Sequence, residues 1–222
     1  MNRTAMRDVR HIDHSRACSW GGMLFALAFM LAPVATKAAD AAIERKAEAC
    51  IACHGAEGQS TTDATPSLAG QTARYLDLQL QEFKTRQRNS ATMSPIAETL
   101  SSDDIRGLAA YFSGQPQMST SYVVDQAKIA NGKAIAAHSQ CATCHEADFT
   151  GHDEFPRIAG QQYHYIVKAL AGFRSGRRHS DGGVMEASTR GMTDHAIESL
   201  AEYLASLNSV DDRAAAARLP AK

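Results

Sequence analysis

The chain repeats one long sequence pattern, and this duplication limits the folds that it can adopt. The stretch "PSLAGQTARYLDLQLQEFKTRQR", which begins at Pro66, aligns without gaps with "PRIAGQQYHYIVKALAGFRSGRR", which begins at Pro156. Further along, "LSSDDIRGLAAYF" from Leu100 aligns with "MTDHAIESLAEYL" from Met192. A repeat of this length predicts two homologous domains, each formed by about half of the chain.

Each half carries a pair of cysteines followed directly by a histidine. The motifs are "CIACH" at Cys50–His54 and "CATCH" at Cys141–His145. Cysteine pairs at this spacing also occur in disulfides, redox dithiols and zinc sites, but C-x-x-C-H is the attachment sequence for c-type haem. We therefore expect two covalently attached haem c groups, held by the thiols of Cys50, Cys53, Cys141 and Cys144, with His54 and His145 as ligands of the iron.

The periodicity between these motifs predicts helices. Apolar residues recur at helical spacing in 72–86 and 161–175, and Ala-rich segments lead into each cysteine pair from about Ala42 and from Val123. Ser101–Ser102 and Thr193 are typical helix caps and predict a third helix in each half. Because no alternating strand pattern is present, the expected fold is all-α, with about three main helices around each haem.

The N-terminus predicts export. Basic residues precede the apolar run 20–34, "WGGMLFALAFMLAPV", and small residues follow it, which is the order of a secretory signal peptide. The run is shorter than the roughly 20 residues of a membrane span, and an uncleaved anchor is the alternative. The expected organisation is a signal peptide at 1–39, a first domain at 40–113, a linker at 114–122, a second domain at 123–207 and a tail at 208–222.

Composition and charge narrow the class of protein. Hydrophobic residues make up 44% of the chain and charged residues 21%, as in soluble globular proteins. The formal net charge is −1, and it becomes −4 once the five basic and two acidic residues of 1–39 are removed. A chain of this charge has no basic face for nucleic acid, and its weak acidity gives at most mild steering toward cationic protein surfaces.

With the C-x-x-C-H motif, the "P-x-[LI]-A-G-Q" sequence, an aromatic helix and a capped last helix, each half resembles a class I cytochrome c. The tandem arrangement over residues 40–207 resembles the periplasmic di-haem type called cytochrome c4. The resemblance implies an all-α fold, His–Met coordination at both haems, and transfer of single electrons toward terminal oxidases. It also implies that the carbonyls of Pro66 and Pro156 accept hydrogen bonds from the ligating histidines and orient them.

The repeat selects the methionines that would complete this coordination. Met93 lies in a predicted loop 12 residues before Ile105, and Met185 lies 12 residues before the equivalent Ile197. Because of this shared spacing, we expect Met93 and Met185 to be the axial thioether ligands. Thioether ligation stabilises ferrous relative to ferric iron. Met192 aligns with Leu100 and is expected to pack in the core, while Met118 in the linker is expected to be an ordinary surface or packing residue.

The remaining polar candidates are expected to face solvent. They include five histidines, of which His152 and His179 are alternatives to Met185 as ligands: His138, His152, His164, His179 and His195. The arginine pairs Arg86/Arg88 and Arg177/Arg178 are also expected to be solvated, with a place near the haem propionates or the domain interface as the alternative. The family further implies a close helix contact, by Gly132 with Tyr203 in the second half and by Ala41 or Ala42 with Tyr111 in the first.

The sequence predicts an electron carrier rather than an enzyme. Two iron centres with both axial positions filled leave no open site for a substrate. The alternatives are a di-haem peroxidase, a sulfur-compound oxidoreductase, or a cytochrome subunit of a membrane oxidase or dehydrogenase. The expected partners are electron donor and acceptor proteins, in particular membrane respiratory complexes, with at most weak or peripheral membrane association.

Overall fold

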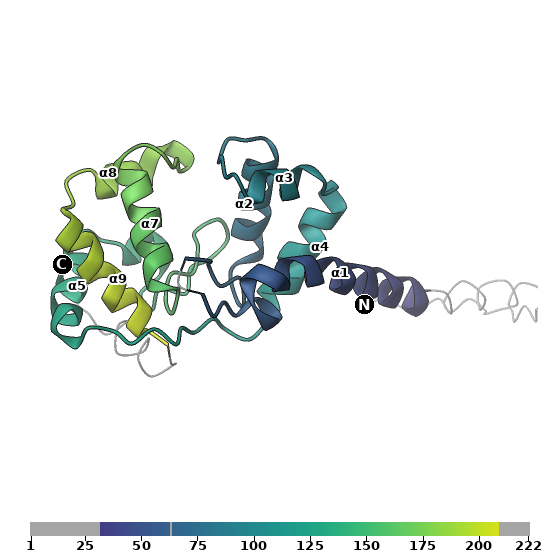
Figure 1. The fold of residues 1–222 in the computed structure, drawn as a ribbon, viewed down its shortest axis with the longest axis horizontal. Helices are drawn as coiled ribbons and strands as arrows, with labels where there is room; N and C mark the ends of the chain where they lie inside the picture. Colours follow the sequence, from purple (N-terminus) through teal and green to yellow (C-terminus); the bar gives the residue numbers. More distant parts are fainter. Residues whose placement is uncertain (1–31, 63, 209–222) are drawn as a thin grey trace, which may run out of the picture. The chain divides into compact units, whose positions relative to one another are not determined.

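The computed structural model of the chain describes residues 32–62 and 64–208, which form helices joined by turns (Figure 1). The first repeat contains α1 (Ala32–His54), α2 (Ala73–Lys84), α3 (Met93–Glu98) and α4 (Ser102–Ser113). The second contains α5 (Gln126–His138), α6 (Ala142–His145), α7 (Tyr163–Arg174), α8 (Val184–Thr189) and α9 (Asp194–Ser206). Short 3-10 turns span Ala56–Gly58 and Asp181–Gly183. The prediction of an all-α fold is confirmed.

Parts of the predicted leader and tail, residues 1–31 and 209–222, lie outside the described residues. The chain divides into two units after Ala38, and both repeats belong to the second unit. Helix α1 begins at Ala32 rather than near Ala42, because the alanines of this segment have the highest helix propensity of any residue. Among the described residues, no helix combines the length and the apolar composition needed to cross a membrane.

Polar side chains cap the N-terminal ends of α2, α4 and α9. The Ser101 hydroxyl accepts a hydrogen bond from the Asp104 N–H, and the Asp104 carboxylate accepts one from the Ser101 N–H, which together form a capping box. Thr193 caps α9 by accepting from the Ala196 N–H, and Thr72 caps α2 by accepting from the Tyr75 N–H. These caps set the register in which the apolar face of each helix meets its core.

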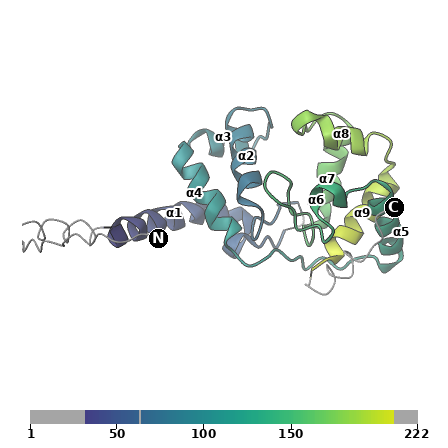
Figure 2. The ribbon, with the colours of Figure 1, turned by 180° about the vertical axis from the view of Figure 1, so that it is seen from behind.

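Each repeat has its own apolar core. In the first, Ala47 of α1 lies in a cluster with Leu76 of α2 and with three residues of α4: Leu108, Ala109 and Phe112. In the second, Ala136 of α5 lies in the equivalent cluster with residues of α7 and α9, among them Ile166, Leu170, Ile197, Leu200 and Leu204. Figures 1 and 2 accordingly show α2, α3 and α4 grouped together, and α5, α7, α8 and α9 grouped together.

A glycine allows the first and last helices of each repeat to approach closely. In the second repeat it is Gly132 of α5, where a Cβ would overlap the Ser199 carbonyl oxygen and lie 2.7 Å from the Tyr203 Cβ, so the expected contact of Gly132 with Tyr203 is present. In the first repeat the close approach is at Gly107 of α4, where a Cβ would overlap the Ile43 side chain of α1. The expected pairing of Ala41 or Ala42 with Tyr111 therefore missed Gly107, because the glycine lies on the opposite helix of the pair.

The predicted linker, 114–122, is packed against both repeats. Met118 is fully buried, and its N–H donates to the Ala69 carbonyl of the first repeat at 3.1 Å. Its Sδ accepts a hydrogen bond from Gln161 Nε2 of the second repeat at 3.3 Å. Met118 is thus a packing residue that contacts both repeats.

Two of the arginines expected in solvent instead lie between the repeats. Arg88 Nη2 donates to the Tyr165 hydroxyl at 3.1 Å, and Arg178 Nη2 donates to the Tyr75 hydroxyl at 2.7 Å. Each guanidinium also lies over a phenylalanine ring of its own repeat, 4.5 Å from the ring centroid. The expectation of solvated arginines is wrong for this pair, since aromatic faces and tyrosine hydroxyls replace water around them. The neighbouring Arg86 and Arg177 are exposed.

Candidate haem-binding sites

The cysteines and histidines of the two motifs are brought together by helix geometry. Cys50, Cys53 and His54 lie in the last turns of α1, at spacings of three and four residues that place side chains on one face. In the second repeat, Cys144 and His145 lie in α6 and Cys141 directly precedes it. All four thiols are free. Each motif therefore presents two thiols and one imidazole from a single short segment.

The state of the thiols and their surroundings disfavours the alternative uses of a cysteine pair. Burial raises the pKa of Cys50, and burial together with neighbouring Cys144 raises the pKa of Cys141 to about 11. A redox dithiol requires the opposite shift, toward a reactive thiolate. Within 32–62 and 64–208, no cluster of three or more His, Cys, Asp or Glu side chains is arranged to hold a metal ion, as a zinc site would require.

Both motif histidines are buried and held by a proline carbonyl. His54 Nδ1 lies 2.8 Å from the Pro66 carbonyl oxygen, and His145 Nδ1 lies 2.8 Å from the Pro156 carbonyl oxygen. Because a carbonyl can only accept, Nδ1 carries the proton in each ring and Nε2 keeps its lone pair. Burial lowers the pKa of both histidines and favours these neutral rings. The arrangement suits coordination of a metal by Nε2 with Nδ1 held from behind.

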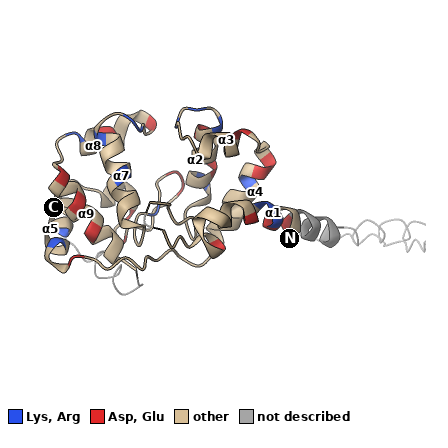
Figure 3. Ribbon diagram, viewed as in Figure 1, with Lys and Arg blue, Asp and Glu red and all other residues tan. Residues whose placement is uncertain are grey.

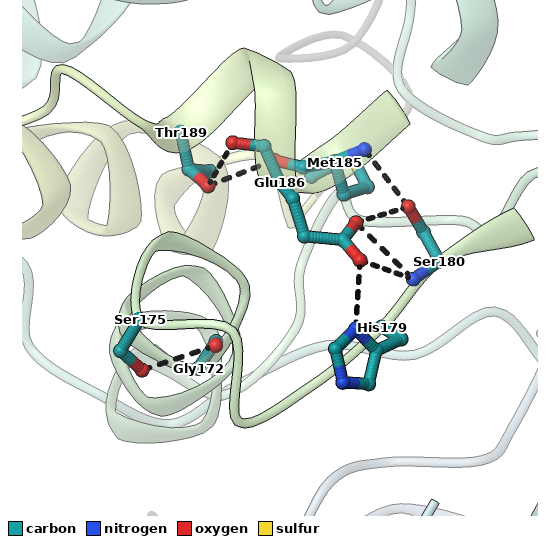
Figure 4. A network of polar contacts seen from close by, with 7 residues as sticks. All are labelled: Gly172, Ser175, His179, Ser180, Met185, Glu186 and Thr189. Atoms are coloured by element: carbon teal, nitrogen blue, oxygen red, sulfur yellow. Dashed lines mark hydrogen bonds and ion pairs between the residues drawn. The ribbon is translucent and has the colours of Figure 1, made fainter. Parts of the chain in front are cut away.

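Met93 and Met185 have the same local structure. Met93 begins α3 and its N–H donates to the Ser90 hydroxyl at 3.1 Å, while Met185 lies at the start of α8 and its N–H donates to the Ser180 hydroxyl at 2.9 Å (Figure 4). Both side chains are half-buried. The expected loop around Met93 is therefore a short helix. The serine that binds each methionine N–H is also repeated in the sequence, but the prediction of the ligands did not depend on it.

Met192 occupies the place of Leu100 in the repeat. Lys84 Nζ donates to the Leu100 carbonyl, and Arg174 Nη1, from the position equivalent to Lys84, donates to the Met192 carbonyl at 2.9 Å. Leu100 and Met192 each pack against the apolar core of their own repeat. The alignment of Met192 with a core leucine thus agrees with the local structure, and Met185 remains the counterpart of Met93.

The two histidines that were alternatives to Met185 are exposed and paired with carboxylates. His179 Nδ1 lies 3.2 Å from Glu186 Oε1, and the same carboxylate accepts from the Ser180 N–H and hydroxyl (Figure 4). Burial raises the pKa of Glu186, but the bonds from Ser180 outweigh burial and lower it. His152 Nδ1 lies 2.9 Å from Glu146 Oε1. Like these two, His138, His164 and His195 are exposed.

The residues present fit a covalently attached haem in each repeat. Each repeat holds two free thiols, an imidazole with Nε2 available and a half-buried methionine, which are the residue types that a His–Met cytochrome uses. In the second repeat, the Tyr203 hydroxyl is buried and has no hydrogen-bond partner among the described residues. A buried unpaired hydroxyl is costly, which agrees with a bound group completing this region.

Two glutamines of the repeated "A-G-Q" sequence make contacts that sequence reasoning missed. Gln71 and Gln161 are buried, and each bonds the backbone of the opposite repeat next to the proline that holds the histidine. Their recurrence at equivalent positions was visible in the sequence. Their partners were not, because those partners lie 86 and 94 residues away along the chain.

Comparisons with known proteins agree with this geometry. The family model for Cytochrome c matches residues 41–115 and 129–208. A cytochrome c4 of Pseudomonas aeruginosa is 34% identical over 188 residues, covering 80% of this chain and 94% of that protein. A thiosulfate dehydrogenase electron acceptor of Thiomonas intermedia is 34% identical over 182 residues, covering 77% and 84%. The crystal structure of reduced recombinant cytochrome c4 from Pseudomonas stutzeri matches with a TM-score of 0.71 and 33% identity, covering 76% and 98%.

Proposed function

The chain belongs to the cytochrome c family, as a tandem class I member of the cytochrome c4 type, and from this we propose that it carries single electrons through the periplasm to a membrane respiratory complex. It is an electron carrier rather than an enzyme and holds two covalently attached haem c groups. The terminal oxidase is the proposed acceptor. The observation that supports the proposal is the similar placement of Met93 and Met185, each at the start of a short helix with its N–H bound by a serine hydroxyl, which makes them the proposed second ligands of the two sites.

In the proposed sites the protein supplies attachment, ligands and orientation. Cys50 and Cys53 tether the first haem, and Cys141 and Cys144 tether the second. His54 with Met93 would bind the iron of the first haem, and His145 with Met185 that of the second, which would leave no position on either iron open to water or peroxide. The Pro66 and Pro156 carbonyls hold the histidine protons on Nδ1. When bound, each haem supplies an iron that exchanges one electron between its ferrous and ferric states.

Export of the chain would remove its N-terminal segment and change its net charge. Residues 1–39 are proposed to be removed on export, which leaves a first domain at 40–113 and a second at 123–207, with the linker at 114–122 and the tail at 208–222. Both acidic and basic residues are scattered over each repeat (Figure 3), and the chain without residues 1–39 has a net charge of −4. We therefore expect docking to its redox partners to depend only weakly on salt.

A second candidate concerns the electron donor. Because a related protein is named as a thiosulfate dehydrogenase electron acceptor, thiosulfate oxidation is a specific candidate source of electrons. Ferric holoprotein, mixed with thiosulfate and a thiosulfate dehydrogenase, is expected to show reduction of both haems by absorbance. The thiosulfate source is contradicted if the ferric spectrum stays unchanged while dithionite reduces both haems.

The carrier function has its own test. Reduced holoprotein is expected to be reoxidised rapidly by respiratory membranes and only slowly in buffer alone, as followed by haem absorbance. The ferric protein is expected to be low-spin at both sites. High-spin iron at either site, or turnover of peroxide, would contradict a carrier with both axial positions filled.

Covalent attachment at the second motif can be tested by removing its thiols. The double substitution Cys141→Ala and Cys144→Ala is expected to lower the covalently bound haem to about half, since only one of the two attachment motifs remains. The measurement is the haem absorbance per protein after denaturation and extraction of unbound haem. Cys18→Ala, in the predicted leader, is the matched control and is expected to change nothing. Full haem content in the double variant would contradict the assignment.

A further inference from the structure

The loops that carry Pro66 and Pro156 are joined across the two repeats by reciprocal glutamine contacts. Gln161 Oε1 accepts from the Ser67 N–H at 2.8 Å, and its Nε2 donates to the Ser67 carbonyl at 3.0 Å. Gln71 makes the same two contacts with Arg157. Its Oε1 accepts from the Arg157 N–H at 2.7 Å, and its Nε2 donates to the Arg157 carbonyl at 2.9 Å. Each glutamine therefore binds both backbone groups of one residue in the opposite repeat.

Each glutamine accepts a hydrogen bond from the N–H of one peptide group. The carbonyl of the same peptide group accepts a hydrogen bond from a motif histidine. The Pro66 carbonyl and the Ser67 N–H are the two ends of one planar, conjugated amide. The carbonyl end accepts from His54 Nδ1, while the N–H end donates to Gln161. The equivalent chain runs from His145 through the Pro156–Arg157 amide to Gln71.

Hydrogen bonds linked through an amide polarise one another. Donation from the N–H end shifts electron density to the carbonyl oxygen, which becomes a stronger acceptor. The effect is largest where water is excluded, and all four residues at the N–H ends, Gln71, Gln161, Ser67 and Arg157, are buried. The side chain of one repeat therefore strengthens the hydrogen bond to the motif histidine of the other.

We propose that Gln71 and Gln161 are positioning residues, each of which lowers the reduction potential of the haem site in the opposite repeat. The inference rests on the proposed function, in which His54 and His145 are axial ligands. A stronger acceptor at Nδ1 makes the imidazole more basic, and a more basic ligand favours ferric over ferrous iron. Gln161 thus acts on the site of His54, and Gln71 acts on the site of His145.

A neighbouring glutamine provides a matched control. Gln162 is also buried and also crosses between the repeats, with Nε2 donating to the Ser60 carbonyl at 2.6 Å and Oε1 accepting from the Thr120 hydroxyl at 2.8 Å. Its contact with Ser67 is to the side-chain hydroxyl, at 3.5 Å, and not to the proline amide. Gln162→Met should therefore weaken the same interface without changing the hydrogen bond to His54.

The test compares Gln71→Met, Gln161→Met and Gln162→Met as holoproteins. Methionine keeps the length of glutamine but removes the strong acceptor and the donor. In the reduced, diamagnetic protein, NMR is expected to show a weaker Nδ1–H hydrogen bond at His145 in Gln71→Met, at His54 in Gln161→Met, and at neither in Gln162→Met. Gln161→Glu supplies a charged, stronger acceptor and is expected to move the His54 signal in the opposite direction to Gln161→Met.

Redox titration gives the second measurement. In each methionine variant the ferric-to-ferrous ratio of the opposite site, at a fixed potential, is expected to fall by up to about two-fold, from a 10–30% change in one hydrogen bond. The two waves are assigned with Met93→Ala and Met185→Ala, each of which displaces the wave of one site. The Gln162→Met titration is expected to match that of the wild type.

Besides an absence of any shift, two results would overturn the inference. One is a shift at the glutamine's own repeat, and the other is an equal shift in all three variants, which would indicate general loosening of the interface. Failure of the proposed function has a different signature, because the wild-type protein would then lack histidine-coordinated low-spin iron at one or both sites. Wild-type coordination with unmoved NMR signals and potentials in the glutamine variants contradicts only the inference.

Discussion

Replacing Met185 with alanine is expected to remove one of the two contributions to the far-red absorption of the ferric protein, which arises from thioether-to-iron coordination. The potential of the second site should fall at the same time, because the thioether stabilises ferrous iron. The expectation rests on the shared structure of Met93 and Met185, each of which follows a serine hydroxyl that accepts its N–H. The measurement is the ferric spectrum per haem, together with a redox titration.

Met192→Ala is the control for this prediction. Met192 packs against the core of the second repeat in the place of Leu100, so its truncation should lower stability and leave the far-red band at full intensity. Loss of the band in Met192→Ala with its retention in Met185→Ala would reverse the assignment. Retention of both contributions in both variants would point to a thioether outside this segment, whereas a wild-type band with the intensity of one site would point to a histidine such as His179.

Gly132→Ala is expected to destabilise the second repeat by about 1–3 kcal/mol, the usual cost of forcing extra volume into a packed contact. A Cβ at this position would overlap the backbone oxygen of Ser199, which cannot move without shifting α9. In an open helix the same substitution would instead stabilise by about 1 kcal/mol, so the sign of the effect reports the helix contact. The measurement is urea unfolding of the holoprotein, followed by circular dichroism.

Gly107→Ala is the matched control in the first repeat. Its Cβ would meet side-chain atoms of Ile43, Cδ1 and Cγ1, and no backbone atom, so the expected loss of stability is smaller than for Gly132→Ala. Equal losses in the two variants would contradict the distinction between a backbone obstacle and a side-chain obstacle. A stabilised Gly132→Ala variant would contradict the close approach of α5 and α9 itself.

Features that depend on local sequence were largely predictable. The predicted capping residues Ser101 and Thr193 mark where α4 and α9 begin, because a cap acts within a few residues of its helix. The alignment of the repeats also predicts Met185 rather than Met192 as the ligand, since both halves share one register, and the two alanine variants test this choice. Helix α3 escaped prediction because it spans only Met93–Glu98, too short for a periodic pattern.

Features that depend on contacts between distant segments were not predictable. Arg88 and Arg178 looked like solvated charges because their tyrosine acceptors are 77 and 103 residues away. Gly107 was overlooked because the partner that makes it necessary, Ile43, lies on another helix. Such choices are set by tertiary packing, which local propensity does not encode.

Four of the contacts between the repeats are related by a two-fold exchange of the halves. Gln71 meets Arg157 while Gln161 meets Ser67, and Arg88 meets Tyr165 while Arg178 meets Tyr75, so each contact recurs with the roles of the halves exchanged. This is the pattern of an isologous homodimer, in which one surface patch is complementary to itself. The covalent linker thus joins two halves that contact one another through these residues as the subunits of a symmetric dimer would.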